Sequence, residues 1–250
     1  MYPLIDTHAH LDEMEDLEVA LENAKQHGVA AIIAMGSDLK SNERVLELAQ
    51  KYKGFVFPAL GLHPWILAEK ASEVRPTLRF IEENLPQAVA LGEVGLDYQK
   101  KLVVQVSKEH QRAILAQVLE LARKYDKPAS IHSRYAWRDC FNVVRESRIK
   151  RAVFHWYTGP INVLREILAE GYLASATPAL SYHEEHRRAV KETPLEKLVL
   201  ETDSPVAYRG NRAEPADVAQ VLELIAEVKR VDPVTAAHAT TKNARRTFGI

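Results

Sequence analysis

Eight alternations of a short apolar segment with a longer amphipathic one predict a (β/α)8 barrel, an α/β fold with a ring of parallel strands inside helices. The length of 250 residues is typical of such a barrel. No Pro/Gly/Ser-rich linker or change of composition divides the chain. A doubly wound sheet that binds a dinucleotide would need a glycine-rich turn after its first strand, and residues 6–10 contain no glycine. We therefore expect residues 1–250 to form one barrel domain with its active site at the carboxyl ends of the strands.

The expected strands are short runs rich in apolar and β-branched residues, as is typical of a parallel sheet buried on both faces. They are Pro3–Ile5, Ala30–Met35, Phe55–Leu60, Val89–Leu91, Pro128–Ile131, Arg151–Phe154, Tyr172–Ala174 and Leu198–Glu201. Each is followed by a segment long enough to return the chain to the other end of the sheet. This order is expected for successive βα units.

The expected helices carry recognisable end signals. Several begin at a serine, a favoured N-cap residue, and the last two open with proline, which suits the first helical turn. The first ends at His27-Gly28, a basic residue followed by a glycine cap. The expected helices are Asp16–His27, Ser41–Lys51, Ser72–Asn84, Ser107–Tyr125, Ala136–Glu146, Ile161–Glu170, His183–Lys191, Pro215–Lys229 and Pro233–Thr247. His183 and His186 are interpreted as surface residues of their helix.

The composition is that of a soluble globular protein, with 46% hydrophobic and 27% charged residues. The net charge of −1 argues against tight non-specific binding to duplex DNA, which normally needs a basic excess. The single cysteine, Cys140, excludes an internal disulfide and a cysteine-based zinc site. Residues 1–10 do not resemble a signal peptide, and Val29–Met35 is too short to cross a membrane. We expect a cytoplasmic protein with no membrane association and no obligate protein partner.

Residues able to bind a metal ion stand at the exits of five expected strands. His8 and His10 are two residues apart at the first exit, so both imidazoles point to the same side. The carboxyl ends of barrel strands converge on one mouth, so residues far apart in sequence meet there. The other ligand-type residues are Glu93, His132, His155 and Asp203, after the fourth, fifth, sixth and eighth strands.

Four imidazoles and two carboxylates are more than one catalytic ion normally takes from a protein. The set therefore favours two divalent ions, as in two-metal hydrolytic sites. Glu93 is the best candidate to bridge them, because its strand lies between the other ligand-bearing exits. Imidazole-rich ligation favours zinc or manganese over magnesium, and the identity of the ions is left open among the three.

Six motifs are spread along the chain, from Ile5 to Pro205. They are Ile5-Asp6-Thr7-His8-Ala9-His10-Leu11, Gly61-Leu62-His63-Pro64, Gly92-Glu93-Val94-Gly95-Leu96-Asp97, Ile131-His132-Ser133-Arg134, His155-Trp156-Tyr157-Thr158-Gly159 and Glu201-Thr202-Asp203-Ser204-Pro205. In this order and spacing the chain resembles the TatD family of metal-dependent deoxyribonucleases, within the amidohydrolase-like TIM barrels. The resemblance implies that His8, His10, Glu93 and Asp203 hold one ion and that Glu93, His132 and His155 hold the other. It also implies removal of nucleotides from the 3′ end of DNA, with magnesium as the usual ion.

Catalytic roles are expected for three residues. Asp203 either takes the proton of the attacking water as general base or is a ligand only, and Glu93 bridges the ions. His63 orients the scissile phosphate, protonates the leaving oxygen, or packs within its loop. Asp6 and Glu201 are expected one layer behind the ligands, where they fix ligand orientation.

Substrate contacts are expected from residues beside the ligand motifs. Arg134 either forks onto a phosphate or pairs with a carboxylate beneath the metals. Tyr98, Trp156 and Tyr157 either stack on unpaired bases or pack in the core and rim.

The leading functional hypothesis is a phosphodiester hydrolase, a two-metal 3′-to-5′ exodeoxyribonuclease that acts on single-stranded DNA. RNA is left open as an alternative substrate, because the sequence does not indicate whether any residue contacts a 2′-hydroxyl group. A second hypothesis is hydrolysis of a carbon ester or amide, as in D-aminoacyl-tRNA or a small-molecule amidohydrolase substrate. Glu93 favours the nuclease, since many small-molecule amidohydrolases bridge their metals through a modified lysine at that strand. A structural metal site or binding scaffold fits poorly, because structural zinc sites are generally closed and four-coordinate.

Overall fold

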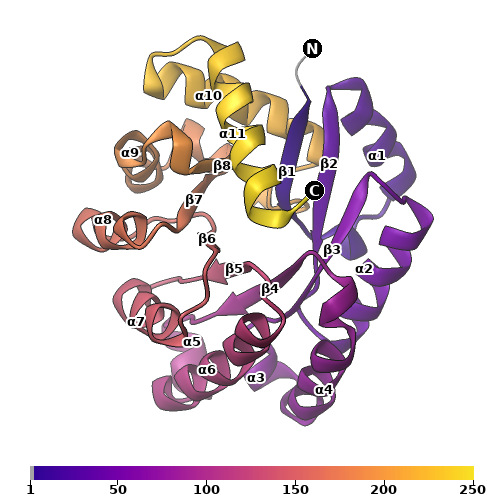
Figure 1. Ribbon diagram of the computed structural model, residues 1–250, viewed down its shortest axis with the longest axis vertical. Helices are drawn as coiled ribbons and strands as arrows, with labels where there is room; N and C mark the ends of the chain where they lie inside the picture. The colour runs from indigo at the N-terminus through magenta and orange to yellow at the C-terminus, as the bar shows by residue number, and fades with distance from the viewer. Residues whose placement is uncertain (1–2) are drawn as a thin grey trace.

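The computed structural model describes residues 3–250, which contain one eight-stranded parallel sheet in the order β1 to β8 (Figure 1). The Thr7 hydroxyl donates to Leu200 O at 2.8 Å, and Ala9 bridges to Ser204, so the first strand joins the last. The strands are β1 Leu4–Ala9, β2 Val29–Met35, β3 Val56–Leu62, β4 Ala90–Gly95, β5 Ala129–His132, β6 Ala152–Phe154, β7 Leu173–Ala176 and β8 Leu198–Leu200. The predicted (β/α)8 barrel is confirmed.

Helices cover the outside of the barrel (Figure 1). They are α1 Leu17–Gln26, α2 Leu39–Lys51, α3 Ile66–Glu69, α4 Val74–Asn84, α5 Lys100–Val103, α6 Lys108–Lys124, α7 Trp137–Ser147, α8 Ile161–Ala169, α9 Glu184–Glu192, α10 Val218–Lys229 and α11 Pro233–Phe248. Each expected helix is present. The four-residue helices α3 and α5 and a hairpin of β9 Ala207–Tyr208 with β10 Asn211–Arg212 were not expected, because such short segments show no hydrophobic period. Within residues 3–250, no helix has the length and apolar composition to span a membrane.

Two strands run four residues past their predicted ends, and one helix starts earlier than predicted. Strand β1 extends to Ala9 and β4 to Gly95, so His8 and Glu93 lie inside strands and not beyond them. The side chains of His8 and Glu93 are polar and face the polar end of the barrel. The pattern of apolar residues therefore does not identify these positions as parts of strands. Helix α2 begins behind Asp38 because the Asp38 carboxylate accepts from the backbone N–H of Ser41, whose hydroxyl accepts from Asp38 N in return.

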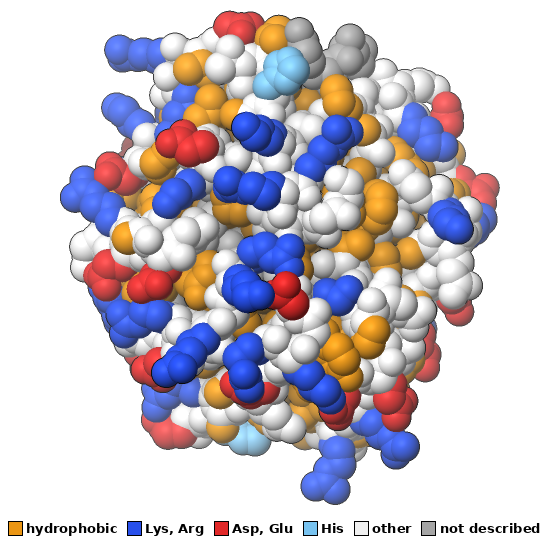
Figure 2. Space-filling view, in the orientation of Figure 1, with side chains coloured by type: hydrophobic (Ala, Val, Ile, Leu, Met, Phe, Trp, Pro, Cys, Tyr) orange, Lys and Arg blue, Asp and Glu red, His pale blue; other side chains and the backbone are white. Residues whose placement is uncertain are grey.

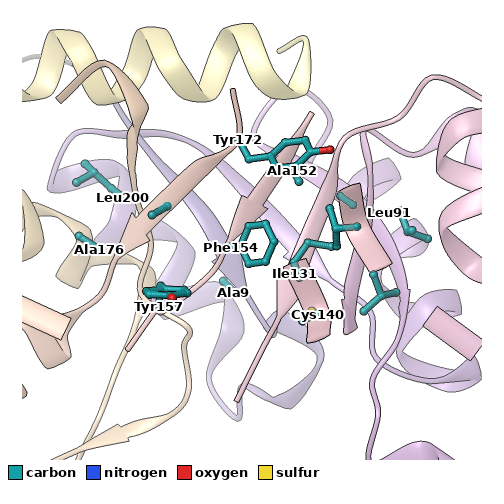
Figure 3. Close-up of a cluster of buried hydrophobic side chains, with 14 of the residues drawn as sticks. Ala9, Leu91, Ile131, Cys140, Ala152, Phe154, Tyr157, Tyr172, Ala176 and Leu200 are labelled. Carbon is teal, nitrogen blue, oxygen red and sulfur yellow. The ribbon is translucent and has the colours of Figure 1, made fainter. Parts of the chain in front are cut away.

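The amino end of the barrel is closed by α11. Phe248 and Ala244 pack against the inward-facing side chains of the strand starts, among them Ile5 and Val199. The Thr241 hydroxyl donates to Pro3 O at 2.6 Å, tying the same helix to the chain before β1. Figure 3 shows α11 beside the starts of β6 and β7, at Ala152 and Tyr172. The carboxyl ends are consequently the open end of the barrel.

Lys and Arg side chains are spread over the face on which α11 lies (Figure 2). Several cap backbone carbonyls near helix ends: Lys197 donates to Leu168 O in α8, and Lys127 donates to Ala88 O beyond α4. Lys229 donates to Thr193 O, just after α9. Since α4, α8 and α9 end on this side, their negative dipole ends lie here and favour cations.

Candidate active site

A cavity of about 980 Å³ opens at the carboxyl ends of the strands. Its lining includes most of the predicted ligands and His63, and His8 lies fully buried directly beneath them. The structure thus brings together side chains from β1, β4 and β5 and from the segments after β3, β6 and β8. These residues are His8, His10, His63, Glu93, His132, His155 and Asp203.

Glu93 lies at the centre of the cluster and faces a different pair of imidazoles with each oxygen. Oε1 is 2.8 Å from His132 Nδ1 and 2.8 Å from His155 Nε2. Oε2 is 3.5 Å from His8 Nε2 and 3.4 Å from His10 Nε2. Burial alone would raise the pKa of Glu93, but the surrounding imidazoles outweigh burial and hold it well below its usual value.

The imidazoles of His8 and His10 face Asp203 as well as Glu93. His8 Nε2 and His10 Nε2 lie 3.5 and 3.6 Å from Asp203 Oδ1. These separations are long for hydrogen bonds, whereas four ligands about 2.1 Å from a tetrahedral ion stand about 3.4 Å apart. His8 Nδ1 bonds to Ser130 Oγ at 3.0 Å, and His8 Nε2 is buried with no hydrogen-bond partner in residues 3–250. The donor set therefore fits a divalent ion held by His8, His10, Glu93 and Asp203.

The second group gathers around Glu93 Oε1. His132 Nδ1 and His155 Nε2 are 3.3 Å apart, and His63 Nε2 approaches Glu93 Oε1 to 3.7 Å. His63, Glu93 and His132 place ligand-type atoms close enough to share one ion. Burial lowers the pKa of His63 to about 3, so its imidazole is neutral at physiological pH. The structure thus adds His63 to the candidate ligands, and its expected phosphate or proton-donor role stays a prediction.

Asp6 and Glu201 lie beneath the cluster and contact it in different ways. Asp6 Oδ1 accepts from the backbone N–H groups of His8 and Thr202, at 3.2 and 3.0 Å, so it orients the backbone beside two ligands. Burial raises the pKa of Asp6 to about 8. Glu201 Oε1 lies 3.5 Å from His155 Nδ1 and accepts from Trp156 N at 3.0 Å, so it faces the ring of His155 directly.

Comparison with known proteins agrees with this arrangement. The family model described as "TatD related DNase" matches residues 5–249. This chain belongs to the TatD family. Human "Deoxyribonuclease TATDN3" is 32% identical over 98% of this chain and 94% of its own length. The "metal-dependent hydrolase YabD" of Bacillus subtilis is 31% identical over 99% of both chains.

Solved structures of TatD proteins superpose on this chain over nearly its whole length. The TatD homologue YJJV from Escherichia coli superposes with a TM-score of 0.89 at 29% identity, covering 99% of this chain and 98% of its own. A TatD-family hydrolase from Entamoeba histolytica, at 23% identity, has a TM-score of 0.86 and covers 99% of this chain and 98% of its own. The protein is therefore a metal-dependent hydrolase of the TatD family with the barrel of that family.

Arg134 pairs with a carboxylate, one of its two expected roles. Its guanidinium donates to Asp97 Oδ2, with Nε at 2.9 Å. The same oxygen accepts from Trp65 Nε1 at 2.7 Å and lies 3.4 Å from His132 Nε2. Burial would raise the pKa of Asp97, but hydrogen bonds from His132 and Arg134 outweigh it and keep the pKa below its usual value. Asp97 lies within a motif of the TatD resemblance, yet sequence reasoning gave it no role.

Of the three predicted stacking residues, Trp156 alone lines the cavity within residues 3–250. Tyr98 lies outside the lining, where its hydroxyl donates to Asp139 at 2.9 Å. Tyr157 is buried among core side chains, with its hydroxyl donating to Pro160 O (Figure 3). Core packing, the other expected role, therefore applies to Tyr157. The cavity is lined instead by Trp65, Tyr135 and Trp137, which follow strand exits and which sequence reasoning passed over.

His186 also differs from its predicted surface position. It is fully buried and accepts from Thr177 N through Nε2 at 3.1 Å, while Nδ1 bonds to Tyr157 O at 3.0 Å. Burial lowers the pKa of His186 to about 4. A helix position alone does not reveal that the loops after β6 and β7 fold over this ring.

Proposed function

We propose that the protein is a two-metal 3′-to-5′ exonuclease that acts on single-stranded DNA. The observation that carries the proposal is the position of Glu93 between two imidazole pairs, one facing each carboxylate oxygen. A carboxylate so placed is suited to lie between two divalent ions. Bound there, such ions neutralise phosphoryl oxygens and lower the barrier for attack by water on phosphorus.

Asp203 is the group best placed to accept a proton from the attacking water. Its side chain lines the cavity, and the backbone N–H of Asp203 donates to His8 O at 2.9 Å, which holds the residue at the rim of β1. Its backbone is left-handed, with φ of 52°, an uncommon conformation for a residue other than glycine. This left-handed backbone places the Asp203 carboxylate in the lining of the cavity.

The shape of the site supports attack at the end of a strand. The barrel core and α11 close the amino end, so the cavity is blind and a strand cannot pass through the barrel. A flexible single-stranded end can reach the floor of such a cavity, and the site therefore suits a substrate that is cleaved from its end. The human relative is named a deoxyribonuclease, which supports DNA as the polymer.

Product analysis on a 5′-labelled single-stranded oligodeoxynucleotide, with magnesium or manganese, tests the proposal. We expect a ladder that shortens from the 3′ end and that is absent in chelator, in Asp203→Asn and in Glu93→Gln. Glu170→Gln, an exposed carboxylate at the other end of the barrel, is the matched control and should cleave normally. Circular dichroism of the variants verifies that the fold is intact.

Two other outcomes would each overturn a different part. Release of short labelled fragments from the 5′ side would make the proposed polarity wrong. A lack of cleavage by metal-loaded wild type on DNA and on an RNA of the same sequence would make the nuclease proposal wrong and direct the search to carbon esters.

A further inference from the structure

We propose that the mouth of the cavity recognises a short unpaired nucleic-acid end mainly by base stacking, with contacts to no more than about two phosphates. This inference rests on the proposed function and specifies its substrate. The chain has three tryptophans, and all three line this one cavity, together with an exposed tyrosine. They come from the segments after β3, β5 and β6 and are Trp65, Tyr135, Trp137 and Trp156.

Tyr135 is the most exposed of these rings, with 61% of its surface accessible. Its φ is 56°, a left-handed conformation that costs free energy for a bulky residue and is typical of functional sites. Its ring stands edge-on to Trp137 at 5.8 Å. That edge-on contact leaves most of Tyr135 exposed, so its ring is available to stack on a base.

The other rings are fixed in place by hydrogen bonds or close packing. Trp65 Nε1 donates to Asp97, and the Lys101 ammonium and the Arg134 guanidinium lie over the Trp65 ring, at 4.2 and 5.0 Å from its centre. Tyr135 and Trp156 are therefore the rings best placed to stack on a base, and the Trp156 ring packs at 5.2 Å from Tyr208. Trp137 lies against Gly159, where a Cβ atom would come within 2.4 Å of the indole. Rings that are already ordered lose little entropy when a base binds, so they are suited to act as a stacking platform.

Charges at the mouth are poorly suited to a long phosphate backbone. Among the described residues that line the cavity, the lysine and arginine side chains are Lys70 and Arg134, and each is already paired, with Asp38 and Asp97. Three further carboxylates outside the ligand cluster share the lining: Glu13, Glu69 and Glu185. A strand extending beyond the site would meet these carboxylates, so tight contact is limited to its last few nucleotides.

Binding of the nucleic-acid end should therefore depend only weakly on salt concentration. For single strands the logarithm of the binding constant falls with the logarithm of salt concentration with a slope of about −0.7 per neutralised phosphate. With two phosphate contacts or fewer we expect a slope no steeper than about −1.4. The free energy of base stacking does not depend on salt. Affinity should also stop rising once the oligonucleotide is longer than the stretch that the aromatic rings of the cavity can contact.

The test is binding of 5′-labelled thymidine oligonucleotides with phosphorothioate 3′ ends, three, six and fifteen nucleotides long, to the metal-loaded protein. Anisotropy and tryptophan fluorescence are recorded from about 25 to 400 mM NaCl, a range that resolves phosphate contacts. We expect tryptophan quenching, the shallow slope, and affinities for the two longer probes within about threefold of each other. A slope of about −2 or steeper, which corresponds to three or more phosphates, or affinity that keeps rising with length, would overturn the inference.

Tyr135→Asn is the sharpest variant, because asparagine accepts the left-handed conformation while removing the ring. We expect binding about tenfold weaker, a raised KM with kcat nearly unchanged, and a melting temperature no lower than that of wild type. Tyr125→Asn, beyond the far end of α6, is the matched control and should bind normally. Unchanged binding by Tyr135→Asn would contradict stacking even if the enzyme cleaves DNA, whereas an absence of both binding and cleavage by wild type would refute the proposed function itself.

Discussion

The two ends of the barrel satisfy their polar groups differently. At the amino ends, Lys127 and Lys197 donate to backbone carbonyls, and Phe248 fills the barrel between the strand starts. At the carboxyl ends, imidazoles and carboxylates crowd together without full hydrogen bonding. In residues 3–250, the buried side-chain polar atoms that lack a partner belong to His8, His10, Asp12, His155, Trp156, Glu201 and Ser204, all in or just after the ends of β1, β6 and β8.

The two ends of the barrel therefore contribute differently to stability and to function. Buried polar groups without partners cost free energy, and those of residues 3–250 lie at the mouth. The closed amino end offsets those costs by burying apolar surface and capping helices. Changes at the amino end should therefore act on stability, and changes at the carboxyl end on binding and catalysis.

The largest expected effect is on stability at the closed end. Phe248→Ala leaves a cavity where α11 closes the barrel, and the free energy of unfolding should fall by about 3–5 kcal/mol. Denaturant unfolding measures the loss. Activity per folded molecule should stay within about twofold of wild type, as no atom of Phe248 reaches the cavity. A tenfold loss of activity in the folded variant would break the separation between the two ends.

The next effect is a pH dependence of stability from His186. Its pKa is about 4 in the folded protein and near 6.5 when unfolded, so the unfolded state binds more protons between these values. Stability due to the neutral ring is full above about pH 6.5 and falls by about 3 kcal/mol as the pH drops to 4.

Unfolding of wild type and His186→Gln across this range measures the effect. The stability advantage of wild type should shrink on acidification, because the uncharged glutamine can accept from Thr177 N and donate to Tyr157 O at any pH. His110→Gln, at an exposed position of α6, is the control and should show the same loss of stability on acidification as wild type. A constant difference between wild type and His186→Gln would show that this ring is not what titrates.

A smaller effect is expected at the mouth from Asp97→Asn. The carboxylate orients His132 and holds Arg134 and Trp65, so its loss should lower metal affinity or kcat/KM by about 10–100-fold. Metal titration of the chelated protein and steady-state kinetics measure the two quantities. Asp139→Asn removes a similar carboxylate–arginine pair, with Arg112, that does not line the cavity. Equal effects of the two substitutions would argue against a positioning role for Asp97.

The smallest effect concerns the helix caps of the closed end. Lys197→Met keeps the aliphatic stem but loses the hydrogen bond to Leu168 O, and we expect a loss of about 1 kcal/mol in the free energy of unfolding. Metal binding and cleavage should not change. Lys53→Met, at an exposed position before β3, should not alter stability. A Lys197 variant as stable as wild type would show that the cap contributes nothing.

The barrel and the ligand cluster could be predicted because their signals are local. Each apolar run with its following amphipathic segment specifies a βα unit, and the convergence of strand ends then brings His8, Glu93 and Asp203 together without knowledge of any contact. The ends of β1 and β4 were less predictable, because polar residues in a strand are stabilised by partners from other strands, as His8 is by Ser130.

The sequence by itself determined the eightfold alternation, the order of the strands and the residues at their exits, because periodicity and strand direction are properties of neighbouring residues. Only the tertiary structure decided which aromatic rings face the cavity, that Arg134 pairs with Asp97, and that His186 is buried. Side-chain directions in the loops depend on contacts between segments far apart in the chain. Tyr157 turns into the core and Tyr135 out of it for that reason, although each lies two or three residues beyond a histidine of the cluster.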